Sequence, residues 1–282
     1  MRHSAGGAAT LTTVTYPFLK GHGTENDFVL LPDLDGTVHG DLTPERVRAL
    51  CDRRAGIGGD GVLRVLRVHA SGTYDADWFM DYRNSDGSLS EMCGNGIRVF
   101  ARYLVDEGLV EAGQPIRIAT RAGVKVVTVD GDLVIVDLGV AQVYDESPVS
   151  VGERTWQARH VDVGNPHAVA FVGDLQEAGP LRVAPTHDES VYPHGVNVEF
   201  VVQVEPGHIA MRVHERGSGE TRSCGTGAGA AMVATAVRER APRGTTYTVD
   251  VPGGRLWATW TQDDRVLLSG PAVVVARGET AL

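Results

Sequence analysis

The same arrangement of residues occurs twice in this chain, each time around a cysteine, and this duplication limits the fold more than any other feature. One copy runs from Asn84 to Cys93-Gly-Asn-Gly, and the other runs from Glu215 to Cys224-Gly-Thr-Gly. In both copies a polar residue stands nine positions before the cysteine, a polar loop containing glycine follows, and Cys-Gly-x-Gly opens a helix-like segment. The two cysteines are 131 residues apart in a chain of 282. We therefore expect two similar lobes that face each other.

Helical patterns follow both cysteines. Apolar residues between Ile97 and Val105 recur at the spacing of one helix face. The segment Ala228–Ala236 is almost entirely small or apolar, which predicts a helix buried on all sides. A further helix is expected to begin at Thr43, an N-cap residue, with Pro44 at its first position.

The remaining signals are those of β-strands. Asp130-Gly131 is typical of a hairpin turn between two apolar runs. The strands expected from such runs are Val124–Val129, Leu133–Leu138, Val198–Val204, Ile209–Val213, Leu256–Trp260 and Val266–Val275. The predicted class is α+β, with two pseudo-symmetric lobes, each a curled and mostly antiparallel sheet around a central helix that starts at a cysteine. The expected divisions are a disordered extension over 1–13, an N-terminal lobe over 14–130, a C-terminal lobe over 131–270, and a strand over about 271–282 that can return to the first lobe.

Composition excludes several classes of protein. The formal charge of −10 and the pI near 5.4 argue against nucleic-acid or anionic-membrane partners, which need a basic surface. No apolar run reaches the roughly 18 residues of a membrane span, so we expect a cytoplasmic protein. The three cysteines form no disulfide framework, and neither they nor the histidines have the spacing of metal ligands. The only lysines are Lys20 and Lys125, and neither is a plausible anchor for pyridoxal phosphate.

A cysteine just before a helix lies where free backbone N–H groups and the positive end of the helix dipole converge. We expect this position to lower the pKa of the thiol, while the adjacent glycines let an anion approach the N–H groups. Two such turns facing one pocket place a sulfur on each side of the carbon next to a bound carboxylate. One thiolate can then remove the α-proton while the opposite thiol delivers another, which inverts the stereocentre.

Other interpretations of the two turns remain open at this point. Both cysteines can be small buried capping residues, a dithiol redox pair, or parts of a non-catalytic module that holds an anion between two helix starts. Neither turn has a Walker-type lysine or a Gly-x-Gly-x-x-Gly fingerprint, which argues against nucleotide binding. Cys51, within the amphipathic stretch Pro44–Arg53, is expected to fill the core.

Six sequence blocks, in order, give the chain a specific resemblance to the diaminopimelate epimerase family from about Phe18 to Ala276. They are Gly21-His-Gly-Thr-Glu-Asn-Asp-Phe28, Arg53-Arg-Ala-Gly-Ile-Gly-Gly-Asp-Gly61, Asn84-Ser-Asp-Gly87 with Met92-Cys-Gly-Asn-Gly96, Gly164-Asn-Pro-His167, Gly195-Val-Asn-Val198, and Glu215-Arg-Gly217 with Ser223-Cys-Gly-Thr-Gly-Ala228. Two positions depart from the family pattern. Glu25 stands where a small residue is usual, and Gly61 stands where some members have a glutamine that touches the substrate.

The resemblance implies epimerisation of LL-diaminopimelate to meso-diaminopimelate without a cofactor, in lysine and cell-wall precursor synthesis, by a homodimer. It implies that Cys93 and Cys224 are the acid/base pair and that His167 supports activity beside the site. The residues that it implies for substrate binding are Asn26, Asn84, Gly94, Asn95, Asn165, Asn197, Glu215, Arg216, Gly225 and Thr226. The closest alternative is a two-cysteine racemase for proline, hydroxyproline or another small amino acid, which would not need the polar set for a second amino-acid end.

Overall fold

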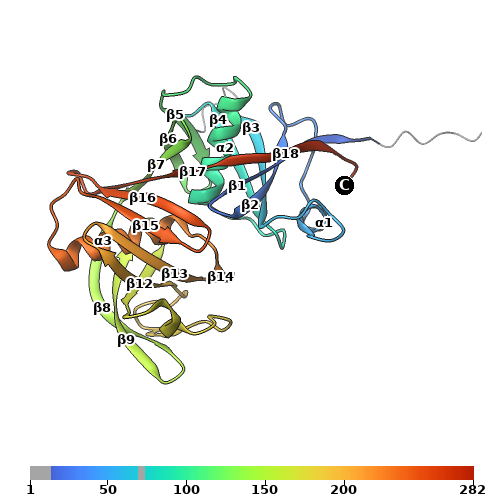
Figure 1. The fold of residues 1–282 in the computed structure, drawn as a ribbon. Helices are drawn as coiled ribbons and strands as arrows, with labels where there is room; N and C mark the ends of the chain where they lie inside the picture. The colour runs from blue at the N-terminus through green and yellow to red at the C-terminus, as the bar shows by residue number, and fades with distance from the viewer. Residues whose placement is uncertain (1–13, 69–73) are drawn as a thin grey trace, which may run out of the picture.

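The computed structural model of the protein describes residues 14–68 and 74–282. The N-terminal and C-terminal halves form two lobes that lie side by side, drawn in blue to green and in yellow to orange (Figure 1). The segment 1–13, predicted to be a disordered extension, lies outside the described residues.

Each lobe is a set of strands with one long helix. The elements of the first half are β1 (Tyr16–Gly23), β2 (Asn26–Pro32), α1 (Pro44–Cys51), β3 (Gly61–Arg67), β4 (Trp78–Asn84), α2 (Gly94–Asp106), β5 (Ile116–Thr120), β6 (Gly123–Asp130) and β7 (Leu133–Val140). The second half contains β8 (Gln142–Val151), β9 (Arg154–Asp162), β10 (Pro166–Phe171), the 3₁₀ helix η1 (Leu175–Ala178), β11 (Thr186–His187), β12 (Asn197–Glu205), β13 (His208–Glu215), β14 (Gly219–Thr221), α3 (Gly225–Glu239), β15 (Thr246–Val251), β16 (Gly254–Trp260), β17 (Arg265–Pro271) and β18 (Val273–Thr280).

The order of strand pairing repeats between the halves. In the first half β2 and β3 are parallel, β3 and β4 antiparallel, β4 and β5 parallel, and β5, β6 and β7 antiparallel. The same sequence of pairings runs through β10, β12, β13, β15, β16 and β17 in the second half. Helix α2 connects β4 to β5, and α3 lies between β13 and β15. The predicted duplication and fold class are therefore confirmed.

The two long helices occupy the centres of the lobes. Helix α2 packs on β1, β2, β6 and β7, and α3 packs on β10, β12, β16 and β17. Ile97, Phe100 and Leu104 on the predicted apolar face of α2 are fully buried. Every residue of Ala228–Ala236 is buried, as predicted, because α3 is enclosed by its sheet. The predicted start of α1 is also confirmed, since the Thr43 hydroxyl accepts a hydrogen bond from the Arg46 N–H.

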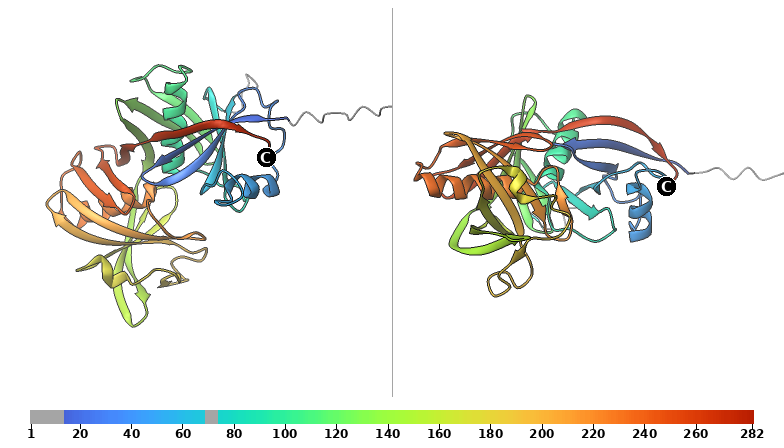
Figure 2. Two further views of the ribbon diagram at one scale, coloured as in Figure 1. Left: turned by 45° about the vertical axis from the view of Figure 1, so that its right-hand side comes forward. Right: turned by 60° about the horizontal axis from the view of Figure 1, so that its bottom comes forward.

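Two strands tie the halves together. Strand β7 pairs with β6 on one side and with β17 on the other, so the strands of both lobes form one continuous sheet. The last strand, β18, runs back over the first lobe and pairs antiparallel with β1 (Figure 2). The expected division near Gly131 stays a prediction, and β7 begins two residues beyond that glycine.

The predicted single strand Val266–Val275 is wrong. It is two strands, β17 and β18, separated at Ala272. Strand β17 pairs with β16 of the second half and with β7, whereas β18 pairs with β1 of the first half, so the chain passes from one lobe to the other at this point. The hairpin predicted at Asp130-Gly131 is confirmed, because Gly131 has a φ of 54° and Asp130 pairs with Leu133.

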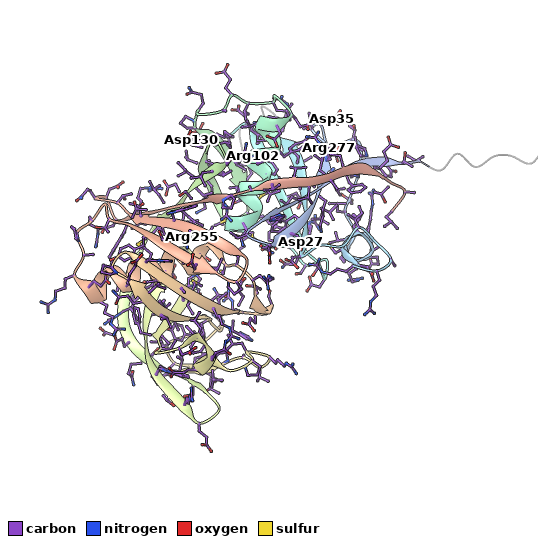
Figure 3. The ribbon with its side chains drawn as sticks, in the orientation of Figure 1. Asp27, Asp35, Arg102, Asp130, Arg255 and Arg277 are labelled. Carbon is purple, nitrogen blue, oxygen red and sulfur yellow. The ribbon has the colours of Figure 1, made fainter. Side chains whose placement is uncertain are left out.

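Figure 3 labels charged side chains on both lobes, among them Arg255 in the second lobe and Arg102 and Arg277 over the first. One of them, Arg277 on β18, forms an ion pair with Glu107 at the end of α2 and so fastens the last strand to the first lobe. Cys51 is buried beside Val47 and Leu50, which confirms its place in the core. Within the described ranges, none of the helices combines the length and apolar character needed to cross a membrane.

Candidate active site

Cys93 and Cys224 are the N-cap residues of α2 and α3. Both have extended backbone angles, with φ and ψ of −137° and 121° at Cys93 and −123° and 116° at Cys224. Each sulfur accepts a hydrogen bond from the N–H three residues further on, at 3.4 Å from Gly96 N and 3.4 Å from Gly227 N. The predicted start of a helix at each cysteine is therefore confirmed, with the sulfur in the place of the usual capping oxygen.

The first turns of the two helices lie directly against each other. A β-carbon on Gly94 would lie 3.4 Å from the Cα of Gly225, and one on Gly225 would lie 3.3 Å from the Cα of Gly94. Because the glycines lack side chains, the positive ends of both helix dipoles converge at one point between the lobes. Asn95 crosses this junction, since its Nδ2 donates to Ser223 O at 2.9 Å. The arrangement is suited to an anion held from both sides.

Further contacts between the lobes surround this junction. The Thr24 hydroxyl, in the turn between β1 and β2, lies 2.6 Å from the Ser223 hydroxyl, directly before Cys224. Arg98, fully buried on α2, donates to Thr24 Oγ1 at 3.2 Å. At the surface, Glu25 forms an ion pair with Arg222. The extra carboxylate at position 25 thus contacts the opposite lobe.

The environment of the sulfurs raises their pKa values. Burial raises the pKa of Cys93 to about 11 and outweighs the backbone hydrogen bonds that lower it. For Cys224, burial raises the pKa well above the usual range, with Glu215 and Glu199 as further causes. The expected lowering by the helix N-terminus is therefore wrong for the protein without substrate, because removal of water from the thiolate is the larger effect. A thiolate formed here is a strong base, as removal of a weakly acidic α-proton requires.

Three polar residues contact the cysteines directly. Asn26 Oδ1 accepts from Cys93 Sγ at 3.6 Å and from Asn95 Nδ2 at 3.1 Å, and its own Nδ2 donates to Asp60 at 2.7 Å. Burial raises the pKa of Glu215, which receives hydrogen bonds from Thr221 and Cys224. On the same side, Thr226 Oγ1 lies 3.5 Å from Cys224 Sγ.

The other residues implied for substrate binding form two small groups. Asn197 Oδ1 accepts from the backbone N–H of Arg216 at 2.9 Å. The Arg216 guanidinium is exposed and forms no ion pair with any residue in the described ranges. In the other group, Asn165 Oδ1 lies 3.1 Å from His167 Nε2. Asn84 stands apart, because its amide donates to Ser88 Oγ at 3.0 Å inside its own turn.

Glu199 is a residue of this site that was not predicted from the sequence. This carboxylate is fully buried in β12 and lies 2.6 Å from His167 Nδ1. The available signal was a charged residue inside the apolar run Val198–Val204, since ionised side chains are rarely buried without a partner. At Gly61, by contrast, a β-carbon would lie 2.5 Å from Arg83 O, so any substrate contact from a side chain there must be replaced from elsewhere.

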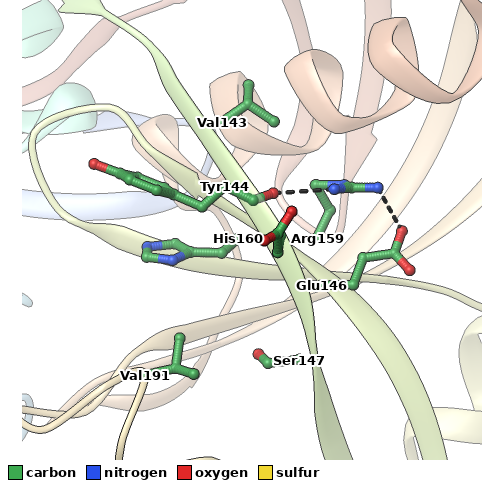
Figure 4. Close-up of a pocket in the computed structure, with 8 residues that line it drawn as sticks. Val143, Tyr144, Glu146, Ser147, Arg159, His160 and Val191 are labelled. Carbon is green, nitrogen blue, oxygen red and sulfur yellow. Dashed lines mark hydrogen bonds and ion pairs between the residues drawn. The ribbon is translucent and has the colours of Figure 1, made fainter.

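A surface cavity of about 590 Å³ lies away from this site, on β8 and β9 (Figure 4). Arg159 in its wall donates to Tyr144 O at 3.0 Å and to Glu146 at 2.8 Å. No residue implied for catalysis or substrate binding lines it.

The family profile described as diaminopimelate epimerase matches residues 18–144 and 159–275. The chain is 58% identical over 276 residues to the diaminopimelate epimerase of Streptomyces coelicolor, which covers 93% of this chain and 94% of that protein. The chain belongs to the diaminopimelate epimerase family. Another relative, the diaminopimelate epimerase of Corynebacterium glutamicum, is 46% identical over 281 residues and covers 95% of this chain and 99% of that protein.

Solved structures of more distant proteins share this fold. A phenazine biosynthesis protein of the PhzF family from Bacillus anthracis superposes with a TM-score of 0.70 at 17% identity, covering 95% of this chain and 99% of that chain. A hydroxyproline epimerase from Agrobacterium vitis superposes with a TM-score of 0.66 at 15% identity, covering 96% of this chain and 94% of that chain. At these identities the likeness extends to the diaminopimelate epimerase fold alone.

Proposed function

We propose that this protein interconverts LL- and meso-2,6-diaminopimelate without a cofactor, and that Cys93 and Cys224 are its acid and base. The observation that carries the proposal is the meeting of two cysteine-capped helix starts at one point between the lobes, with the Cα of Gly94 against that of Gly225. Family membership supports the substrate.

The proposed reaction removes a proton from one face of the α-carbon and delivers a proton to the opposite face. In one direction a thiolate removes the α-proton from its face and becomes a thiol. The opposite thiol donates its proton to the other face and becomes a thiolate, so the configuration inverts and no proton is gained or lost overall. The reverse reaction starts from this second arrangement of protons, and each cysteine then has the other role.

The intermediate carbanion requires stabilisation by its own carboxylate. We propose that the free N–H groups at the first turns of α2 and α3, from Gly94, Asn95, Gly225 and Thr226, donate to this carboxylate as it gains enediolate character. One such donor typically contributes a factor of about 10²–10³ in kcat. Closure of the lobes would exclude water and strengthen these interactions.

The second amino-acid end of diaminopimelate needs its own partners. We propose that the Arg216 guanidinium binds the distal carboxylate, because it is exposed beside the site and a planar fork suits bidentate binding. Asn165, Asn197 and Asn84 would surround this end with neutral amides, and Glu215 would accept from an ammonium group. A proline racemase has no need of such a set.

We further propose a homodimer that acts in the cytoplasm, in the synthesis of lysine and cell-wall precursors. The strand β18 supports the dimer, because it pairs with β1 along one edge and exposes 45% of Val273 and 56% of Val275. Light scattering during size-exclusion chromatography tests the assembly, and a mass of 30.1 kDa, that of one chain, would contradict it.

The first test follows solvent deuterium by NMR, with reduced protein in heavy water, LL-diaminopimelate and no added cofactor. The proposal requires deuterium at one α-carbon together with the appearance of meso product. Cys93→Ala and Cys224→Ala should each abolish formation of the meso product. Cys51→Ala is the matched control, because it removes a buried thiol from α1 and should leave the reaction intact.

No exchange with the fully reduced protein would overturn the diaminopimelate assignment. Proline and hydroxyproline would then be tried under the same conditions. Exchange with either of these alone would assign the protein to the two-cysteine racemases.

A further inference from the structure

Glu199 is a buried carboxylate that the proposed mechanism does not use. It lies in β12 between Val198 and Phe200, and the whole residue is shielded from solvent. One oxygen, Oε1, lies 2.6 Å from His167 Nδ1, and Oε2 has no hydrogen-bond partner among the described residues. Because an unpaired ionised carboxylate is costly to bury, its partner is expected to carry a positive charge.

The contacts of His167 indicate which charge it carries. Its Nδ1 faces the Glu199 carboxylate, and its Nε2 lies 3.1 Å from Asn165 Oδ1. Both partners are acceptors, and a histidine ring donates from both nitrogens only as the imidazolium. The oxygen of Asn165 is then occupied by the ring, which leaves its NH₂ group as the free end of the amide.

The other lobe has no such group at the equivalent positions. The register of β2 with β3 pairs Phe28 with Gly61, as the register of β10 with β12 pairs His167 with Asn197. Phe28 therefore corresponds to His167, and Leu63, two residues after Gly61, corresponds to Glu199. Both Phe28 and Leu63 are fully buried. The fold thus accepts an apolar pair at these positions. We therefore infer that the pairing of Glu199 with His167 serves the site in the second lobe and is not required by the fold.

We propose that Glu199 is a positioning residue, which holds His167 as an imidazolium and thereby turns the NH₂ group of Asn165 toward a carboxylate of the substrate. This rests on the proposed function in one respect, the contact between Asn165 and the substrate. The substrate class follows from the chemistry: an amide NH₂ donates to a carboxylate, whereas the carbonyl end would accept from an ammonium group.

The charge on His167 can be measured without any substrate. In protein labelled with ¹⁵N-histidine, long-range ¹H–¹⁵N spectra distinguish imidazolium from neutral rings, and His167→Gln identifies the signal. We expect both ring nitrogens of His167 to carry protons at neutral pH, and Glu199→Gln to convert the ring to a neutral tautomer. Glu199→Asp, which keeps the negative charge, should keep the imidazolium. A neutral His167 in the unmodified protein would overturn the proposal even if no variant folds.

Glu205→Gln is the matched control. Glu205 lies on the same strand and faces His208 Nδ1 at 3.6 Å, but it is exposed. Its replacement should leave the His167 signals unchanged.

Kinetics test the consequence for the substrate. Loss of one well-placed hydrogen bond to a charged group predicts that Glu199→Gln lowers kcat/KM by roughly 10- to 100-fold, with Glu199→Asp closer to the unmodified protein. The decrease in kcat/KM should be the same for the LL-to-meso and the meso-to-LL reaction, because the ratio of the two kcat/KM values is fixed by the equilibrium constant. An unchanged kcat/KM in folded Glu199→Gln would overturn the positioning role. Absence of any diaminopimelate turnover in the unmodified protein would instead count against the proposed function and leave the NMR result to stand alone.

Discussion

Gly253, at the tip of the hairpin between β15 and β16, lies against the turn between β1 and β2 of the other lobe with no room for a side chain. A β-carbon added there would lie 1.9 Å from the Thr24 carbonyl oxygen and 3.1 Å from Arg222 O. The Gly253 N–H already donates to Arg222 O at 2.8 Å. Because the obstacle is backbone, Gly253→Ala must move one turn away from the other.

The size of that movement follows from the distances. Real β-carbons essentially never lie closer than 3.0 Å to another heavy atom. The two turns must therefore move apart by about 1.1 Å to lengthen the distance between the added β-carbon and Thr24 O from 1.9 Å to 3.0 Å. Thr24 hydrogen-bonds to Ser223, directly before Cys224, and the same turn leads to Asn26 beside Cys93. The shift therefore changes the spacing of the two sulfurs. A misplacement of about 1 Å costs about 10²-fold in rate, or about 2.7 kcal/mol of transition-state stabilisation.

The assay is kcat for formation of meso product, with thermal unfolding measured on the same samples. Gly207→Ala is the control, because Gly207 also follows a proline in a hairpin turn but has open space around it and a φ of +76°. Its methyl group strains the local backbone by roughly 1 kcal/mol without touching the other lobe. If folded Gly253→Ala keeps a normal kcat, or if Gly207→Ala loses as much, the contact at Thr24 does not set the spacing of the cysteines.

Three further predictions follow from the same structure. Burial holds the pKa of Cys93 at about 11, so the rate of its alkylation by iodoacetamide should rise about tenfold with each pH unit from pH 7 upward. Peptide mass spectrometry measures this rate, and a plateau near pH 8 would contradict the prediction. Arg216→Ala should raise the KM for diaminopimelate by roughly 10- to 100-fold through loss of a charged hydrogen bond, and steady-state kinetics with an unchanged KM would refute its role. Arg222→Ala should change the free energy of unfolding in urea by no more than about 1 kcal/mol, because both partners of the Glu25 ion pair are at least half exposed, and a loss above about 2 kcal/mol would show that the pair matters more than exposure implies.

Features of the fold that depend on neighbouring residues could be predicted from the sequence. The two Cys-Gly-x-Gly turns predict the starts of helices, because a helix start depends on a capping residue and small first-turn residues that are adjacent in the sequence. The enclosure of α3 could be predicted because no face of Ala228–Ala236 is polar. The duplication of the fold could be predicted because both copies keep the same nine-residue interval before the cysteine.

Features that depend on distant pairing could not be predicted. Gly270-Pro271, directly before Ala272, is a local break signal, but it does not reveal that β17 pairs with β7 before the break and that β18 pairs with β1 after it. The pairing of Glu199 with His167 requires the parallel alignment of β10 and β12, which the chain reaches only through the connection between them. The pKa of Cys93 was mispredicted for a related reason. The helix dipole can be inferred from the sequence, but the burial that opposes it depends on how distant segments pack around the sulfur.

The return of β18 to the first lobe has a consequence for biosynthesis. Tyr16 pairs with Thr280, so β1 acquires this neighbouring strand only long after β1 itself has been made. Nascent chains generally fold from the N-terminus, but here the sheet of the first lobe keeps an open edge at β1 until β18 has been made. An open edge invites pairing with other chains, so this interval is the time of greatest risk of aggregation. Termination of synthesis before β18 would therefore damage the first lobe, although every residue of that lobe's central helix had already been made.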